Sequence, residues 1–191
     1  MTEIRKRHAE AISAEDRSRA SIGRNAGIVE GVEASGYYTV ECIGADGKVR
    51  WSDTIENLVT TVGKNDLLDK YLAGSAYTAT WYLGLISSTS YTTGPAAGDT
   101  SSSHGGWTED TNYSNSTRPS PSFSSASGGS KGASATAFNI NGSTTIKGCF
   151  LISSNTKGGT TGILYSAGLF SGGDKVVGNG DTLNVTYTAT A

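Results

Sequence analysis

A serine nucleophile activated by a histidine is the first chemistry to consider. The chain has only two histidines, so few such pairs are possible. His104 follows three serines in the stretch SSSHGGW, an order that would suit a serine nucleophile beside its base. Nucleophilic catalysis needs a base within hydrogen-bond distance of the nucleophile. His8 lies in a charged N-terminal segment, so a Ser–His pair would have to use His104. The glycine-rich setting instead favours a loop histidine.

Carboxylates offer two further chemistries, paired acids for glycoside cleavage and ligands for calcium. Asp174 and Asp181 in DKVVGNGD lack the regular ligand alternation of a calcium loop. The glycine-rich stretches GDTSSSHGG and SGGSKGAS do not match the phosphate-binding pattern GxxxxGK[ST]. The remaining candidate acids lie at turns or loop ends, where aspartate is ordinary turn chemistry. They are Asp53, Glu56, Asp99, Glu109 and Asp110. We expect no enzyme and no cofactor.

The two cysteines, Cys42 and Cys149, each sit in an apolar, strand-like run. This setting predicts buried free thiols. A metal site is disfavoured, because the chain has no CxxC spacing and only two histidines.

Aromatic residues suggest two alternatives, a sugar-binding platform or packing in the core and at subunit interfaces. The second is favoured. Trp81 and Tyr82 are neighbours, so on a strand their side chains face opposite sides. The candidate packing and interface aromatics are Trp51, Trp81, Tyr82 and Trp107, with Tyr37 and Tyr38 as further members of a platform.

Composition points to an all-β protein with long turns. Charged residues make up 17% of the 191 residues, against about 25% in typical domains, and glycine is abundant at 26 residues. The net charge of −2 argues against nucleic-acid binding, which needs a clustered basic patch. Without a long apolar run or an apolar leader, we expect no membrane span, no secretory signal and folding in a cytoplasm. Low-charge Ser/Thr/Gly surfaces are common where copies pack together.

Two regions divide the chain: an N-terminal arm or frayed helix over residues 1–35 and a single β-sandwich domain over 36–191. The arm is either a solvated segment or one that orders on a partner surface. Its basic residues are the candidate partner-binding set: Arg5, Lys6, Arg7, Arg17, Arg19 and Arg24.

A tight turn at Asp46-Gly47 predicts a β-hairpin, and a short helix is predicted over about residues 63–73. Thr60 or Thr61 is the expected N-cap. The helix carries an apolar face of Leu67, Leu68, Tyr71 and Leu72. A helix this short is unstable alone, so we expect it to dock through that face.

The Ser/Thr/Gly-rich stretch at 87–134 is predicted as a long loop. Trp107, Tyr113 and Phe123 indicate that parts of it pack, and such a segment can stay ordered by lying against a neighbouring subunit. The closing third is predicted as a meander, with strands at about 135–140, 144–152, 162–170, 174–178 and 182–189. Short strands separated by glycine turns favour an antiparallel β-sandwich or jelly roll.

The stretches VECIGADGKVRWSDTIENLVTTVGKNDLLDKYLAGSAYTATWYLGLI and TKGGTTGILYSAGLFSGGDKVVGNGDTLNVTYTATA resemble small structural proteins of tailed bacteriophages. The resemblance covers about residues 36–86 and 144–191. Some phage capsids carry jelly-roll cement proteins of this size, so the resemblance implies a decoration protein of the head exterior, made in the bacterial cytoplasm. The implied partners are the major capsid protein and further copies of the chain. The alternative is a tail or fibre component that recognises host glycan near Trp107 and Tyr113.

Overall fold

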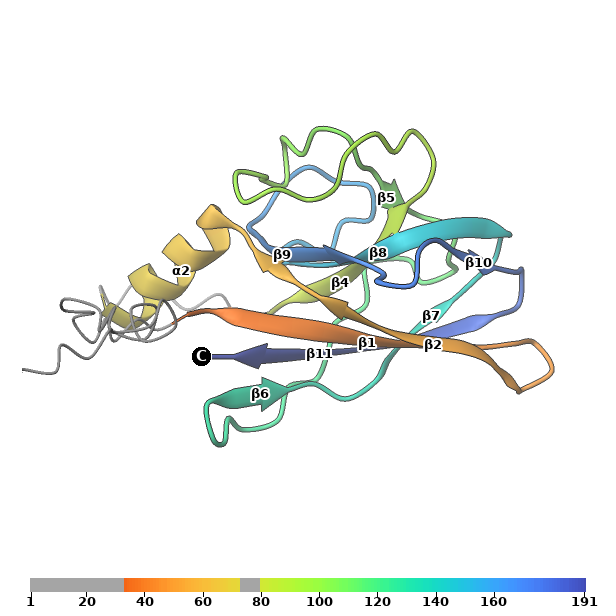
Figure 1. Ribbon diagram of the computed structural model, residues 1–191, viewed down its shortest axis with the longest axis horizontal. Coiled ribbons are helices and arrows are strands. Elements are labelled where there is room, and N and C mark those ends of the chain that lie inside the picture. The colour runs from red at the N-terminus through yellow and green to blue at the C-terminus, as the bar shows by residue number, and fades with distance from the viewer. Residues whose placement is uncertain (1–32, 73–79) are drawn as a thin grey trace, which may run out of the picture. The chain divides into compact units, whose positions relative to one another are not determined.

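Two antiparallel sheets form the body of the protein in the computed structural model, which describes residues 33–72 and 80–191 (Figure 1). The predicted mainly β class, with an antiparallel sandwich and a short helix, is confirmed. The elements are β1 (Ser35–Ile43), β2 (Val49–Glu56), β3 (Leu58–Val59), α2 (Thr61–Leu72), β4 (Tyr82–Ser87), β5 (Glu109–Asp110), β6 (Ser130–Gly132), β7 (Thr136–Asn139), β8 (Thr144–Ile152), β9 (Leu164–Leu169), β10 (Lys175–Val177) and β11 (Thr182–Thr190).

The first sheet is centred on the pairing of β1 with β11, the first and last described strands. Their register runs without a shift from Ser35 opposite Thr190 to Ile43 opposite Thr182. β2 pairs with the other edge of β1, while β7 and β6 pair with successive parts of β11. The predicted hairpin is confirmed, with Gly47 at a φ of 75° in its turn, a backbone angle that glycine adopts without strain.

The second sheet has the order β3-β9-β8-β4-β5, and β10 pairs with the first part of β8. The chain passes into it directly after β2, since β3 pairs with β9. The predicted meander is wrong, because β7 and β11 lie in the first sheet whereas β8, β9 and β10 lie in the second. Glycine turns mark where strands end, but they do not specify which of two sheets the next strand joins.

The inter-sheet core lies between the two sheets. Alternate residues of β11 point inward, as the period of two in a strand requires. Both cysteines are buried and free, as predicted. Burial raises the pKa of Cys42 to about 11, with the negative charge of Asp181 as a second cause. The fully buried residues of this core include Tyr38, Val40, Cys42, Leu83, Leu85, Cys149, Leu183 and Val185.

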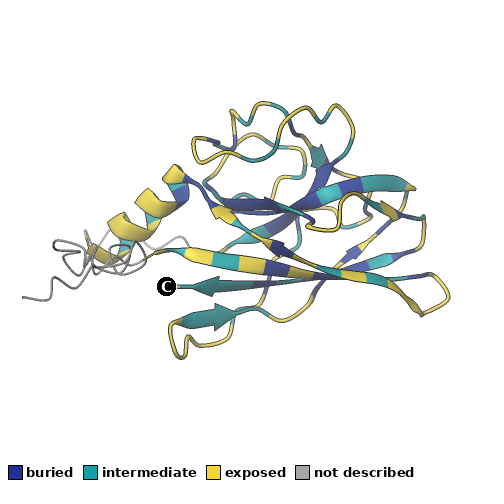
Figure 2. Cartoon of the chain, in the orientation of Figure 1, coloured by how far each residue is buried: buried dark blue, intermediate teal, exposed yellow. Residues whose placement is uncertain are grey.

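The outer face of the second sheet is also covered, so β8 is buried on both sides (Figure 2). Phe150 and Ile152 of β8 pack there with Trp107, in an outer cluster completed by Ile86, Leu164 and Ala167. Trp107 belongs to the stretch 87–134, which therefore packs on its own chain and contains β5 and β6. The packing of parts of this stretch agrees with its aromatic content, and a neighbouring subunit beside it stays a prediction.

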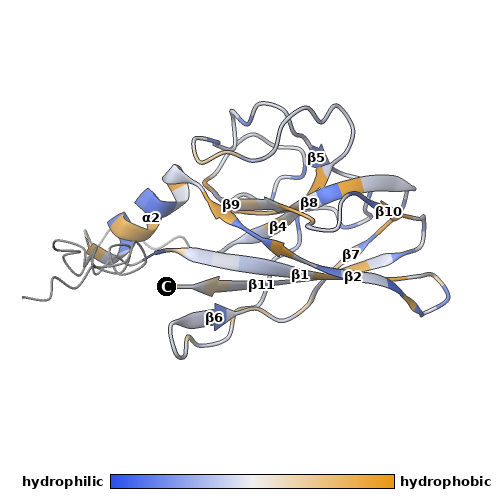
Figure 3. Ribbon diagram, in the orientation of Figure 1, coloured by the Kyte–Doolittle hydropathy of each residue, from blue (hydrophilic) through white to orange (hydrophobic). Residues whose placement is uncertain are grey.

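Helix α2 begins as predicted but does not dock as predicted. The backbone N–H of Gly63 donates to Thr60 Oγ1 at 3.1 Å, which makes Thr60 the N-cap. The apolar face is exposed instead of docked: Tyr71 is 86% and Leu72 is 73% exposed. Figure 3 shows hydrophobic segments, in orange, on this helix. The buried residue of α2 is Gly63.

Gly63 is the reason for this orientation. A β-carbon there would lie 2.5 Å from the carbonyl oxygen of Tyr165, so only glycine allows α2 to approach β9 this closely. With about 3.6 residues per turn, the side of Gly63 continues through Asp66, Leu67 and Lys70. The other apolar residues fall on a flank roughly a quarter to a half turn away.

Candidate functional site

A cavity of about 200 Å³ opens at the end of the sandwich that carries α2. We call this cavity the end pocket. Its apolar walls come from α2, β8, β9 and β11, from the residue before β4 and from the loop before β6. The apolar lining residues are Leu67, Trp81, Phe123, Leu151, Tyr165, Tyr187 and Ala189.

The aromatic walls of the end pocket are packed edge to face. The rings of Trp81 and Tyr165 have centroids 5.3 Å apart at an interplanar angle of 62°. Phe123 meets Tyr187 in the same way, at 6.3 Å and 89°. Edge-to-face pairs of this kind stabilise a fixed arrangement of rings. The walls are therefore preformed.

Three charged side chains also line the end pocket: Asp66, Lys70 and Lys131. Lys70 pairs with Asp66 on the same helix at 3.4 Å, and Lys131 Nζ donates to the carbonyl oxygen of Ser124 at 2.7 Å. Burial raises the pKa of Tyr165, and the charge of Asp66 raises it further. Burial likewise raises the pKa of Tyr187. Both phenols are therefore neutral at physiological pH, and the pocket suits an apolar group.

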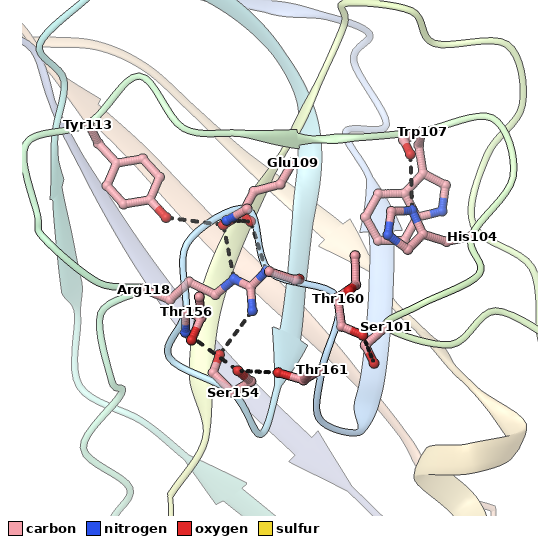
Figure 4. A network of polar contacts seen from close by, with 12 residues as sticks. Ser101, His104, Trp107, Glu109, Tyr113, Arg118, Ser154, Thr156, Thr160 and Thr161 are labelled. Carbon is pink, nitrogen blue, oxygen red and sulfur yellow. Dashed lines mark hydrogen bonds and ion pairs between the residues drawn. The ribbon is translucent and has the colours of Figure 1, made fainter.

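A second group of polar residues lies above the outer cluster, around the ion pair of Arg118 and Glu109 (Figure 4). The guanidinium contacts the carboxylate through two bonds, of 2.8 Å and 3.0 Å. It also donates to the carbonyl oxygens of Ser154 and Gly159, at 3.0 Å each. Arg118 thereby joins β5 to the loop between β8 and β9.

The carboxylate of Glu109 accepts two further hydrogen bonds. Tyr113 Oη donates to it at 3.1 Å, and the backbone N–H of Gly158 donates at 2.6 Å. Burial raises the pKa of Tyr113, and the neighbouring Glu109 raises it further. Because Arg118 and Glu109 are both occupied by the chain's own groups, this cluster serves to hold loops together.

The Ser–His pair that the sequence disfavours at His104 is not formed. His104 stacks on Trp107 with ring centroids 4.0 Å apart, and its Nδ1 lies 3.0 Å from the Trp107 carbonyl oxygen. Ser101 Oγ donates instead to the carbonyl oxygen of Gly162 at 2.6 Å. The interpretation of His104 as a loop histidine agrees with this geometry.

The two aspartates weighed as calcium ligands have separate partners. Asp174 pairs with Lys147 at 2.6 Å, whereas Asp181 is buried and pairs with Arg50 at 3.2 Å. In the part of the chain that the structure describes, no group of three or more metal-ligating side chains occurs.

The four candidate interface aromatics are spread over the body. Trp81 packs against the inter-sheet core and Tyr82 against the outer cluster, so their predicted opposite orientation is confirmed. Trp51 meets Phe170 edge-on at 5.6 Å. Trp107 is buried, and its Nε1 donates to Asp99 at 2.9 Å. Their role between subunits stays a prediction.

Sequence reasoning missed the residues that complete the end pocket, Phe123, Tyr165 and Tyr187. Tyr187 stands at an inward position of the alternating run NVTYTAT, which is a signal for burial but not for a pocket. The six basic residues predicted to bind a partner, from Arg5 to Arg24, lie outside the described residues.

No family model matches the chain, and no curated protein matches it. Among the described residues, no helix is both long and apolar enough to cross a membrane.

Proposed function

We propose that this chain is a capsid decoration protein of a tailed bacteriophage, which binds the head exterior and braces neighbouring capsomers. One observation carries the proposal: the two stretches that resemble phage structural proteins pair with each other in both sheets. β1 pairs with β11, and β4 and β3 pair with β8 and β9 respectively. The stretches that carry the resemblance therefore supply paired strands of both sheets, which supports the proposal.

The end of the sandwich with the end pocket is where we expect the chain to meet its partner. Ser35 pairs with Thr190, so the start of β1 and the end of β11 lie together, and Ala189 lines the end pocket. Residues 1–32, with their six basic side chains, precede this point in the sequence.

The mechanism is burial of surface repeated over a shell. A standard protein interface buries about 1,600 Å² in total, and a closed shell multiplies it over many symmetric copies. We propose that the major capsid protein offers acidic groups to Arg5, Lys6 and Arg7 and to Arg17, Arg19 and Arg24.

Truncation of the arm tests this role. Deletion of residues 1–30 is expected to leave a folded sandwich that no longer co-sediments with mature heads of the encoding phage. Replacing Arg7 with glutamine should weaken binding and its salt dependence, and replacing Arg5 and Lys6 as well should weaken both further. Lys48→Gln in the hairpin turn is the charge-matched control for Arg7→Gln. Full head binding by the truncated chain would refute the role of the arm.

The alternative is a tail or fibre component that binds host glycan near Trp107 and Tyr113. Both side chains are buried, so neither offers an open face for stacking on sugar. The copy number in purified virions separates the two functions. The copy number of a decoration protein scales with the number of capsomers, whereas a tail protein is present in far fewer copies. Glycan-array binding by the isolated chain, combined with a low copy number, would favour the alternative.

A further inference from the structure

The flank of α2 presents apolar side chains to solvent beside the end pocket. Leu68, Tyr71 and Leu72 are 52%, 86% and 73% exposed. Tyr71 follows Leu67 by four positions, so the two lie one turn apart on neighbouring parts of the helix surface. Leu67 lines the end pocket. An exposed aromatic side chain and an apolar hole therefore stand next to each other on one short helix.

The size of the end pocket indicates what it holds. Pockets for drug-sized ligands are about 300–1,000 Å³. The end pocket, at about 200 Å³, is smaller and suits a single large side chain. Aromatic side chains that fill such pockets are the usual anchors of protein interfaces.

The charges on α2 are compatible with a second copy of the same chain as the partner. Lys64 and Lys70 are balanced by Asp66 and Asp69, so the helix has no net charge. A strongly acidic or basic partner would gain little from this surface. Two copies of it do not repel each other.

We propose that two copies of this chain pair about a two-fold axis beside α2, with Tyr71 of each copy inserted into the end pocket of the other. Two-fold contacts use the same patch on both copies, so the inserted side chain and the hole must lie on one face of the molecule, on opposite sides of the axis. Their position on the same helix meets this condition. A head-to-tail ring would instead need the two features on different sides of the molecule.

The contact is expected to be weak in dilute solution and strong at high local concentration. A stable dimer buries about 800 Å² on each partner, which is more than the flank of a twelve-residue helix offers on its own. The pairing needs no capsid, so it can be measured on the isolated chain and does not depend on the head-binding proposal.

Sedimentation velocity of the full-length chain over a concentration series tests the pairing. We expect a reversible monomer–dimer equilibrium, and Tyr71→Ser should raise the dissociation constant of the dimer by at least about tenfold. Val176→Ser is the matched control, because Val176 is 71% exposed on β10, away from α2, and its loss should leave the equilibrium unchanged.

A second variant fills the hole without touching the inserted side chain. Ala189→Leu places a larger side chain in the lining of the end pocket and should weaken dimerisation like Tyr71→Ser. Circular dichroism and the melting temperature show whether each variant is folded. A chain that is monomeric at every concentration overturns the proposal, as does a dimer that neither variant weakens. Loss of head binding by Tyr71→Ser in a monomeric chain would assign the flank to the capsid instead, which also overturns it.

Discussion

The outer cluster and the end pocket are both rich in aromatic side chains, yet only the outer cluster is closed. Trp107 and Phe150 are 3% and 2% exposed beneath the chain's own loops. Trp81 and Tyr165, at the end pocket, are half-buried and line an open cavity. What differs is the segment that lies over the rings.

The cover of the outer cluster is built from small neutral residues. Such residues lie close to a sheet and use backbone groups for hydrogen bonds, as when Ser87 donates its N–H to the Thr108 carbonyl oxygen at 2.9 Å. The helix beside the end pocket carries more apolar side chains but turns them outward. A polar loop can therefore seal an apolar cluster that an amphipathic helix leaves open, provided that the loop satisfies its own polar groups.

The largest effect is expected from the ion pair that fixes the closed region. Arg118→Ala removes a side chain that is 2% exposed and leaves Glu109 charged and nearly buried. Breaking a buried pair from one side costs about 3–5 kcal/mol in the free energy of unfolding. Urea denaturation measures this loss.

Lys147→Ala is the matched control for Arg118→Ala. Its ion pair with Asp174 is partly exposed, and exposed pairs contribute about 1 kcal/mol or less. Equal losses from the two substitutions would show that the loops above the outer cluster do not depend on Arg118.

A smaller effect is expected from the hydrogen bond of the buried indole. Trp107→Phe keeps an aromatic ring in the outer cluster but removes the donor to Asp99, which is itself buried. Loss of one partner of a buried acceptor costs about 1–3 kcal/mol. Trp81→Phe in the half-open end pocket should cost less in the same urea assay. The reverse order would contradict the contrast between the two regions.

Thr60 connects β9 of the second sheet to the start of α2, and removing its hydroxyl tests this connection. Its hydroxyl caps α2 through the Gly63 N–H and donates to the carbonyl oxygen of Leu164 in β9. Thr60→Ala should lower stability by about 1–2 kcal/mol, whereas Thr60→Ser keeps the hydroxyl and should restore most of it. Thermal unfolding of the two variants makes the comparison. An equal loss in both would mean that the hydroxyl does not hold this connection.

Features that depend on residues close together in the sequence could be predicted, whereas features that depend on contacts between distant residues could not. The hairpin at Asp46-Gly47, the cap at Thr60 and the buried cysteines depend on nearby residues, and all three were predicted correctly. The orientation of α2 was not, because it depends on the contact of Gly63 with Tyr165, about a hundred residues away. The end pocket was missed for the same reason, since Phe123, Tyr165 and Tyr187 come from separate parts of the chain.

The smallest effect is expected on the helix face that the sequence predicted to be docked. Leu68→Ala, on the exposed flank of α2, should change the free energy of unfolding by no more than about 0.5 kcal/mol at concentrations where the chain is monomeric. Alanine is also the better helix former, which offsets the lost contacts. The same substitution at Leu164, fully buried in the outer cluster, should cost about 2–5 kcal/mol. Both variants lose the same atoms, so the gap between them combines the difference in burial with the helix preference of alanine at Leu68. A loss at Leu68 as large as that at Leu164 would mean that α2 docks through its leucines after all.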